Sequence, residues 1–180
     1  MRGLREDGVI EIKLNSPEQI LNSLDPSPFI HRDLDDRAAN YIIEHAGEGG
    51  SNIDFTLVIE MPAAEIERDL AAVLPSALRN SFCSRATSAR LQLKDLFRTG
   101  RVALAIGFLV LALCLSAIWS LELFMARGAF LLMLEQGLFI LGYVAVWRPM
   151  EIFLYDWWPL RKRIKLLDRL ATAKVELRAR

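Results

Sequence analysis

Two long apolar runs constrain the fold of this chain more than any other feature of its sequence. The first run, Val102 to Leu121, has no charged side chain, and the second, Gly128 to Trp147, has one, Glu135. Each run holds 20 residues, and a helix of that length spans about 30 Å, the thickness of the hydrocarbon core of a bilayer. Two buried helices of a soluble protein are the alternative, but the polar remainder of the chain is too small to cover so much apolar surface. The sequence therefore predicts a transmembrane helical hairpin.

The charges are unevenly distributed, although 22 basic and 22 acidic side chains cancel. Residues 1–70 carry 15 acidic and 6 basic side chains, whereas residues 79–101 carry six basic residues and one acidic residue. Nine more basic residues follow the second run, and the connecting loop, residues 122–127, has one. Because Lys and Arg that flank a span stay in the cytoplasm, both termini are predicted to be cytoplasmic.

The N-terminal residues, MRGLREDG, are polar and do not resemble a signal peptide, so the first span is expected to direct insertion. The acidic N-terminal part is then not exported. Of the two cysteines, Cys83 is placed on the cytoplasmic side and Cys114 inside the membrane. No structural disulfide is expected between them.

Residues 1–62 are predicted to form a small cytoplasmic α/β domain. Apolar and polar residues alternate over Val9 to Leu14 and over Ile53 to Glu60, a pattern typical of half-buried strands. Between them we expect a short helix from Ser16 to about Leu24 and a second helix over Leu34 to His45. A crossover of this length joins parallel strands. Because two strands leave both sheet edges open, support from neighbouring subunits or the following helix is expected.

Residues 63–101 are predicted to form an amphipathic juxtamembrane helix, which Pro75 kinks or interrupts. The second half of this helix is basic and carries interleaved apolar residues. Such a helix either lies against anionic headgroups or stands off the membrane as a stalk. The sequence favours neither arrangement.

Residues 148–180 are predicted to form an interfacial aromatic and basic segment and a C-terminal helix over 160–177. Trp and Tyr prefer the membrane interface, and Lys and Arg bind its anionic surface, so anionic lipids of the inner leaflet are the expected partners. Simple anchoring is the main interpretation, and a lipid or partner site is the alternative. The predicted anchors are Trp147, Arg148, Tyr155, Trp157, Trp158, Arg161, Lys162 and Arg163.

The run from Arg148 to Pro159, RPMEIFLYDWWP, resembles a signature in a family of uncharacterised bacterial membrane proteins with two spans. The segments FIHRDLDD, Phe29 to Asp36, and Thr99 to Arg101 are also similar to segments of this family. The resemblance implies a bacterial inner-membrane protein with a cytoplasmic domain, and it implies no particular activity.

Glu135 is the most informative single residue, because a charged carboxylate near the bilayer centre costs about 2.5 to 3.5 kcal/mol. Such a residue is expected to face protein or water rather than lipid. Two interpretations remain open. In the functional one, Glu135 lines a pore or accepts protons, with Gln136 beside it. In the structural one, Glu135 is a protonated carboxyl that forms a hydrogen bond between helices or subunits. The small residues Ala103, Gly107, Gly137 and Gly142 give a weak signal for close helix packing.

No catalytic, cofactor-binding or metal-binding residue is predicted. A phosphate loop, a cysteine pair with zinc spacing and a nucleophile elbow are all missing from the sequence. His31, Asp33, Asp35 and Asp36 do not have the spacing of a known metal site, and helix capping explains the acidic residues. The basic residues lie beside aromatic residues and the spans, which favours lipid over nucleic acid.

The predicted fold class is an α-helical membrane protein, a two-helix hairpin with a small N-terminal α/β domain and a basic interfacial C-terminal helix. The leading hypothesis for its function is a self-associating scaffold or membrane anchor for a cytoplasmic partner. A small oligomeric ion channel or transporter, with Glu135 lining the pathway, is the alternative. An enzyme is ranked last, because the sequence contains no set of catalytic residues.

Overall fold

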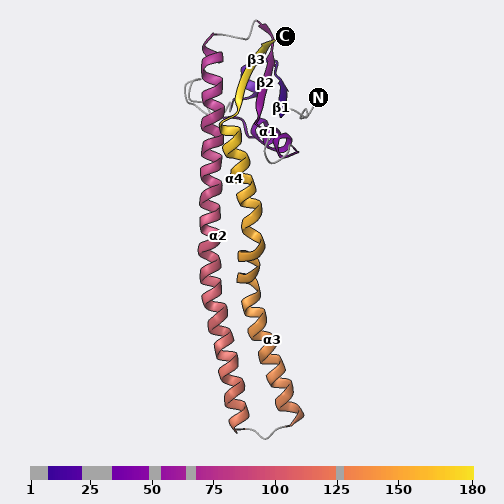
Figure 1. Cartoon of the computed structure of the whole chain (residues 1–180), viewed down its shortest axis with the longest axis vertical. Helices are drawn as coiled ribbons and strands as arrows, with labels where there is room; N and C mark the ends of the chain where they lie inside the picture. Colours follow the sequence, from indigo (N-terminus) through magenta and orange to yellow (C-terminus); the bar gives the residue numbers. More distant parts are fainter. Residues whose placement is uncertain (1–7, 22–33, 49–53, 64–67, 125–127) are drawn as a thin grey trace. The chain divides into compact units, whose positions relative to one another are not determined.

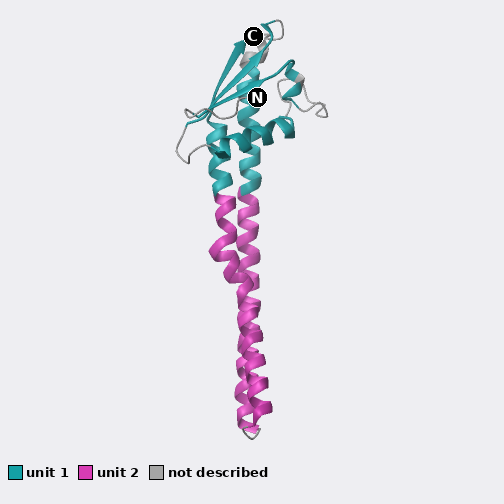
Figure 2. Ribbon diagram, turned by 90° about the vertical axis from the view of Figure 1, so that its right-hand side faces the viewer, with its two compact units in different colours: residues 1–89, 162–180 teal, residues 90–161 magenta. Residues whose placement is uncertain are grey.

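The computed structural model of the chain describes residues 8–21, 34–48, 54–63, 68–124 and 128–180 (Figure 1). The protein is mostly helical and divides into two compact units. Unit 1 comprises residues 1–89 and 162–180, and unit 2 comprises residues 90–161 (Figure 2). The two ends of the chain therefore belong to the same unit, and the two apolar runs lie in the other.

Unit 1 contains a parallel sheet in the order β1-β2-β3, formed by β1 (Val9–Lys13), β2 (Thr56–Met61) and β3 (Lys174–Ala179). The parallel pairing of the first two strands was predicted and is confirmed. Ile10, Leu57 and Val175 lie in register across the three strands. Ile10, Ile12 and Leu14 are buried, as the alternation in the sequence predicted.

The third strand was not predicted, and the helix expected over 160–177 is wrong in its last part. Helix α4 (Trp157–Ala171) ends at Ala171, and Leu177 lies in β3. The segment KVELRA alternates apolar and charged residues, so its period matches a strand lying on an apolar core. Strand β2 becomes the central strand, and its Leu57, Val58 and Ile59 are all buried. The support that a two-stranded sheet lacks comes from the C-terminal part of the same chain.

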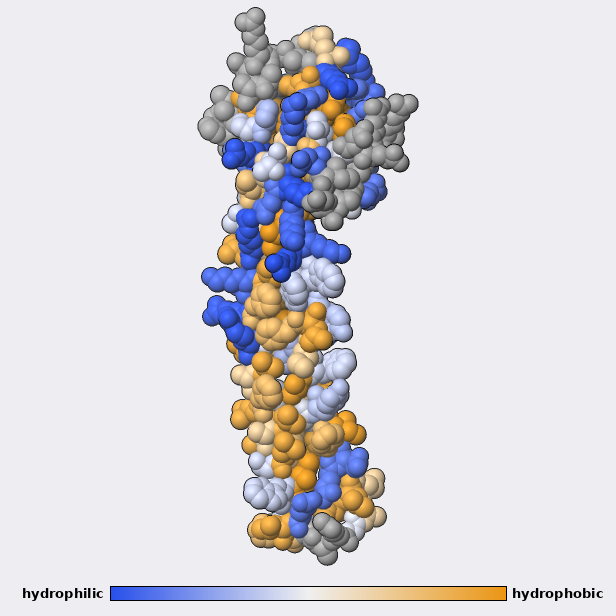
Figure 3. Space-filling view, in the orientation of Figure 1, coloured by the Kyte–Doolittle hydropathy of each residue, from blue (hydrophilic) through white to orange (hydrophobic). Residues whose placement is uncertain are grey.

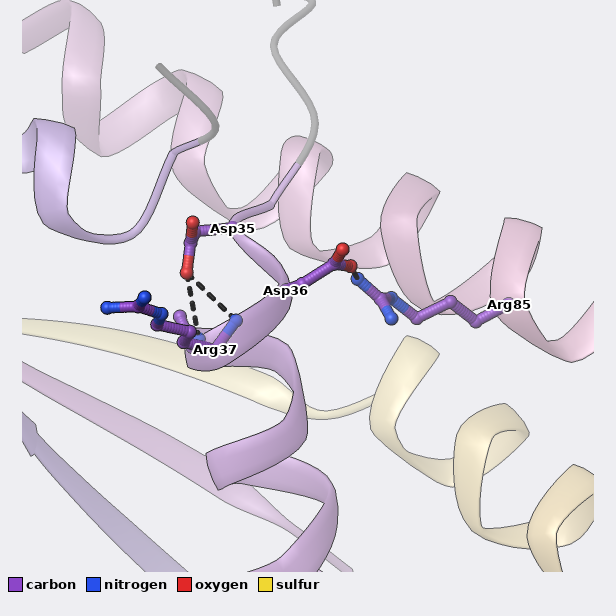
Figure 4. A network of polar contacts seen from close by, with 5 residues as sticks. Asp35, Asp36, Arg37 and Arg85 are labelled. Carbon is purple, nitrogen blue, oxygen red and sulfur yellow. Dashed lines mark hydrogen bonds and ion pairs between the residues drawn. The ribbon is translucent and has the colours of Figure 1, made fainter. Parts of the chain in front are cut away.

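Helix α1 (Asp36–Glu48) begins later than the predicted Leu34 because Asp35 caps it. The Asp35 Oδ1 atom accepts hydrogen bonds from the backbone N–H groups of Arg37, at 2.8 Å, and Ala38, at 3.3 Å (Figure 4). These donors would otherwise lack partners in the first helical turn. The helix buries Ala39, Ile42 and Ala46, which lie at helical spacing on one face.

The short helix predicted from Ser16 is a single 3-10 turn, η1 (Pro17–Gln19), among the described residues. The Ser16 side chain does not cap it, whereas the Gln19 Oε1 atom accepts a hydrogen bond from the Asn15 N–H at 2.8 Å. The remainder of that prediction, together with His31 and Asp33, lies outside the described residues.

Helix α2 (Arg68–Phe124) continues through Pro75, so the predicted interruption at this proline is wrong, and the predicted kink stays a prediction. The part of α2 in unit 1 lies beside the second half of α4 in both views (Figures 1 and 2). Both segments bury one face, which in α2 includes Leu78 and Phe82 and in α4 includes Leu167 and Leu170. The Arg169 guanidinium lies 4.5 Å from the centre of the Phe55 ring and joins α4 to the start of β2.

The face of the sheet opposite to Ile10 and Leu57 carries paired charges. Lys13 Nζ lies 2.9 Å from Glu60 Oε2, and the two residues are register partners on β1 and β2. The hydrogen bond from Lys13 lowers the pKa of the Glu60 carboxyl below its usual value of 4.5. Lys174, at 3.0 Å, lowers the pKa of Glu176 on β3 by the same mechanism.

Candidate functional site: an apolar helical hairpin

Unit 2 contains two helices that are long and apolar enough to cross a membrane, the C-terminal part of α2 and the helix α3 (Ala129–Glu151). Their side chains are mostly exposed, and orange, hydrophobic atoms cover this part of the chain (Figure 3). An exposed apolar surface of this extent is far larger than a soluble monomer presents. The exposed large residues include Leu109, Leu113, Trp119, Phe130 and Phe139.

Glycines bring α2 and α3 into close contact. A Cβ atom on Gly107 would lie 2.7 Å from the Ala145 carbonyl oxygen, and a Cβ atom on Gly142 would lie 2.8 Å from Leu111 Cδ1. Both positions agree with the predicted role of small residues. Gly137, which the sequence placed in the same group, has nothing within 4 Å of the position that a Cβ atom would occupy. A small residue permits a close approach but does not show which face of the helix meets a neighbour.

The Ala145 carbonyl that Gly107 meets lacks its usual donor within α3. In a regular helix the Ala145 carbonyl would accept a hydrogen bond from the N–H of residue 149. Proline has no N–H, and Pro149 lies inside α3. Gly107 is close enough for its Cα–H group to face this carbonyl, a weak interaction that recurs at helix interfaces.

A π-helical turn, η4 (Ile152–Asp156), follows α3 and was not predicted. A Cβ atom on Gly100 of α2 would lie 2.9 Å from Ile152 Cγ2, so glycine is needed where the turn meets α2. The Phe97 and Phe153 rings lie 6.0 Å apart at the same contact. The Trp157 Nε1–H donates a 2.9 Å hydrogen bond to the Phe153 carbonyl. The turn is thus held by one indole and by packing against α2.

The predicted anchors fall into two groups. Trp147, Tyr155 and Trp158 are exposed, as are Arg161, Lys162 and Arg163. Trp157 is half-buried, bonds the π turn, and carries the Arg161 guanidinium 5.6 Å from its ring centre, so its role is at least partly internal.

Arg148 lies at the end of the second apolar run and is paired within unit 2. Its Nη1 atom lies 2.9 Å from Glu151 Oε2, and its Nη2 atom lies 3.8 Å from Asp156 Oδ2. These pairs connect the last turn of α3 to η4. The sequence did not show that Arg148 pairs with two carboxylates, because the π turn sets where Asp156 lies relative to Arg148.

Glu135 precedes Gly142 by seven residues and therefore lies on the face of α3 that meets α2. Its side chain is half-exposed, and in the described part of the chain it has no hydrogen-bond or ion-pair partner. Gln136 is exposed and points away from that face. The structure therefore does not bring the two predicted polar residues together on one surface.

Within the described ranges, no group of three or more His, Cys, Asp and Glu side chains could hold a metal ion. His45 Nδ1 lies 2.9 Å from the Tyr41 carbonyl, and the two rings are 4.0 Å apart, which gives this histidine a local role in α1. Comparisons with protein-family models, curated proteins and solved structures found no match to the chain.

Proposed function

We propose that the chain is an integral protein of the bacterial inner membrane that self-associates and acts as a scaffold or membrane anchor. The observation that supports this proposal best is the pairing of β3 with β2. These strands precede and follow the two apolar helices, and they are hydrogen-bonded in register within one sheet. If the helices cross a bilayer, both ends of the hairpin lie on the same side.

The charge distribution supports a cytoplasmic position for that side. Six basic residues in 79–101 and nine in 148–180 flank the hairpin, whereas its loop has one. Because basic flanks stay in the cytoplasm, the sheet is proposed to be a cytoplasmic domain tethered at both ends. A scaffold or anchor would present this domain to a cytoplasmic partner.

Self-association is proposed because Glu135 has no partner among the described residues and lies in an apolar run. A polar side chain in lipid is stabilised when it bonds a neighbouring helix or faces water. A second copy of the chain would supply such a neighbour.

The experiment combines membrane topology with native mass. Reporter domains that are active only in the cytoplasm are fused after Arg180 and inserted at residue 126, and the purified protein is then weighed in mild detergent. Activity only of the C-terminal fusion and a mass of two or more copies are expected. An active loop fusion would contradict the orientation, and a strictly monomeric particle would contradict self-association.

The alternative proposal, an oligomeric ion channel or transporter, is favoured by the same Glu135 carboxyl. One hairpin is too small to enclose a pathway, so several copies would have to form a ring. Proteoliposomes carrying the wild type, Glu135→Gln or the control Glu122→Gln are compared for ion flux. Flux that Glu135→Gln alone changes would support a channel, and flux equal to that of empty liposomes would exclude it.

A further inference from the structure

Helix α2 does not break where its basic part meets the first apolar run. Within unit 2 it continues from Arg90 through Val102 as one α-helix. If the apolar run crosses a bilayer, residues 90–101 extend the axis of the crossing helix, and each residue lies about 1.5 Å further from the hydrocarbon core. Of the two arrangements that the sequence left open, this continuity favours a helix that stands off the membrane over one that lies on its surface.

The two arginines nearest the first apolar run lie at the depth of the lipid headgroups. The polar layer on each side of the hydrocarbon core is about 5 to 8 Å thick. Arg101 and Arg98 precede Val102 by one and four residues, so their backbone lies about 1.5 and 6 Å along the helix from the run. Arg90 lies about 18 Å along the helix from it, beyond this layer. We call Arg98 and Arg101 the arginine pair.

The arginine pair is exposed and has no counter-charge in the described part of the chain. Because the two residues are three positions apart, their side chains are neighbours on the surface of α2. Neither side chain has a hydrogen bond or an ion pair with another described residue, and Asp95, the one acidic residue in 90–101, pairs with neither. Neighbouring like charges repel each other on a helix. An anion that contacts both guanidinium groups would stabilise this arrangement.

The cation at the end of the second apolar run is, by contrast, already neutralised within unit 2. Arg148 lies 2.9 Å from a Glu151 carboxylate oxygen and 3.8 Å from one of Asp156. One cation with two carboxylates leaves this end of α3 and η4 without an excess of positive charge. The sequence predicted Arg148 as an anchor on the anionic surface, but the positive charge that lacks a partner at this boundary lies on α2.

We infer that the arginine pair binds the phosphate groups of anionic phospholipids in the cytoplasmic leaflet. This inference rests on the proposed function, because it requires the first apolar run to cross the bilayer with its basic end in the cytoplasm. A guanidinium donates two parallel N–H groups to a phosphate, so two neighbouring arginines can hold one headgroup or two. An anionic lipid fits better than a zwitterionic one, in which the headgroup's own ammonium competes for the phosphate.

The inference is tested by native mass spectrometry, which gives the affinity of the first lipid that binds to the protein in mild detergent. The probes are phosphatidylglycerol and phosphatidylcholine, and the wild type is expected to prefer phosphatidylglycerol. Arg98→Gln with Arg101→Gln should weaken binding of phosphatidylglycerol about fivefold for each charge removed, the usual contribution of a basic residue at an anionic surface.

A charge-matched control removes two cations that lie beyond the headgroup layer. Arg90 and Arg161 are both exposed and lie 12 and 14 residues from Val102 and Trp147, the nearest ends of the apolar runs. These separations correspond to about 18 and 20 Å along the helices, more than a Debye length at physiological salt. Arg90→Gln with Arg161→Gln is therefore expected to leave the affinity for phosphatidylglycerol unchanged.

The outcomes separate this inference from the proposed function. Unchanged affinity in the variant of the arginine pair would overturn the inference, and so would an equal loss in the control. A loss in the charge-neutral variant Arg148→Gln with Glu151→Gln would place the lipid at the end of α3 and would also overturn it. Release of the wild-type chain from membranes by alkaline carbonate would overturn the proposed function, and the inference with it.

Discussion

Gly107 of α2 lies against the carbonyl oxygen of Ala145 in α3, at a point where a Cβ atom would come within 2.7 Å of that oxygen. Pro149 leaves this carbonyl without its usual donor in the helix. The two features depend on each other, because the proline frees a polar group in an apolar hairpin and the glycine allows α2 to approach and cover it. The contact fixes how the two helices are aligned.

Gly107→Ala is therefore expected to destabilise the hairpin by about 1 to 3 kcal/mol, as for other overpacked contacts, because a backbone carbonyl cannot rotate away. The measurement is the thermal unfolding midpoint in mild detergent. Gly142→Ala is expected to cost less, since its obstacle is the end of the flexible Leu111 side chain. Gly137→Ala serves as the control, because its Cβ would contact nothing within 4 Å. Equal midpoints for the 107 and 137 variants would contradict the proposed helix contact.

Asp35→Ala is expected to destabilise unit 1 by about 1 kcal/mol, the usual cost of losing an N-cap acceptor. Asp35 satisfies the N–H groups of Arg37 and Ala38, which would otherwise lack a partner. Asp35→Asn keeps an acceptor oxygen and should remain close to the wild type. Asp36→Ala leaves the cap intact and removes the 2.7 Å pair with Arg85, in which the carboxylate is exposed, so it tests whether the loss comes from capping or from charge. Unfolding in urea, followed by circular dichroism, compares the variants, and a loss as large for Asn as for Ala would argue against capping.

The sequence was sufficient to predict the apolar hairpin, β1 and β2, because each shows a clear period or an uninterrupted apolar run. It did not reveal β3, since KVELRA is short and Leu177 follows Leu170 by seven residues, a spacing that also suits a helix. The π turn was missed for a different reason. Its position depends on the room that Gly100 leaves on α2 and on the Trp157 hydrogen bond, and both depend on which helix faces meet.

The stability of unit 1 is expected to fall in acid partly through the pair formed by Lys13 and Glu60. Lys13 lowers the pKa of Glu60 in the folded chain below its usual value of 4.5. The folded state therefore binds this proton less readily than the unfolded state, and the stabilisation is complete above pH 4.5 and lost as the pH falls through the folded pKa. Lys13→Gln should be less stable than the wild type at pH 7 and should approach it near pH 3. Unfolding midpoints across this range provide the measurement, and parallel curves for the two proteins would contradict the coupling.

Ending the chain after Ala173 is expected to unfold the sheet although residues 8–63 are unchanged. The truncation removes β3, exposes one edge of β2 and leaves the two-stranded arrangement that is marginal on its own. Limited proteolysis of detergent-solubilised protein should then cut within β1 and β2, which the intact sheet protects. The control ends after Ala179 and loses only Arg180, with its N–H bond to the Met61 carbonyl and its side-chain bond to Asn15. If the chain that ends after Ala173 resists the protease as well as the control does, β1 and β2 fold without the strand that follows the hairpin.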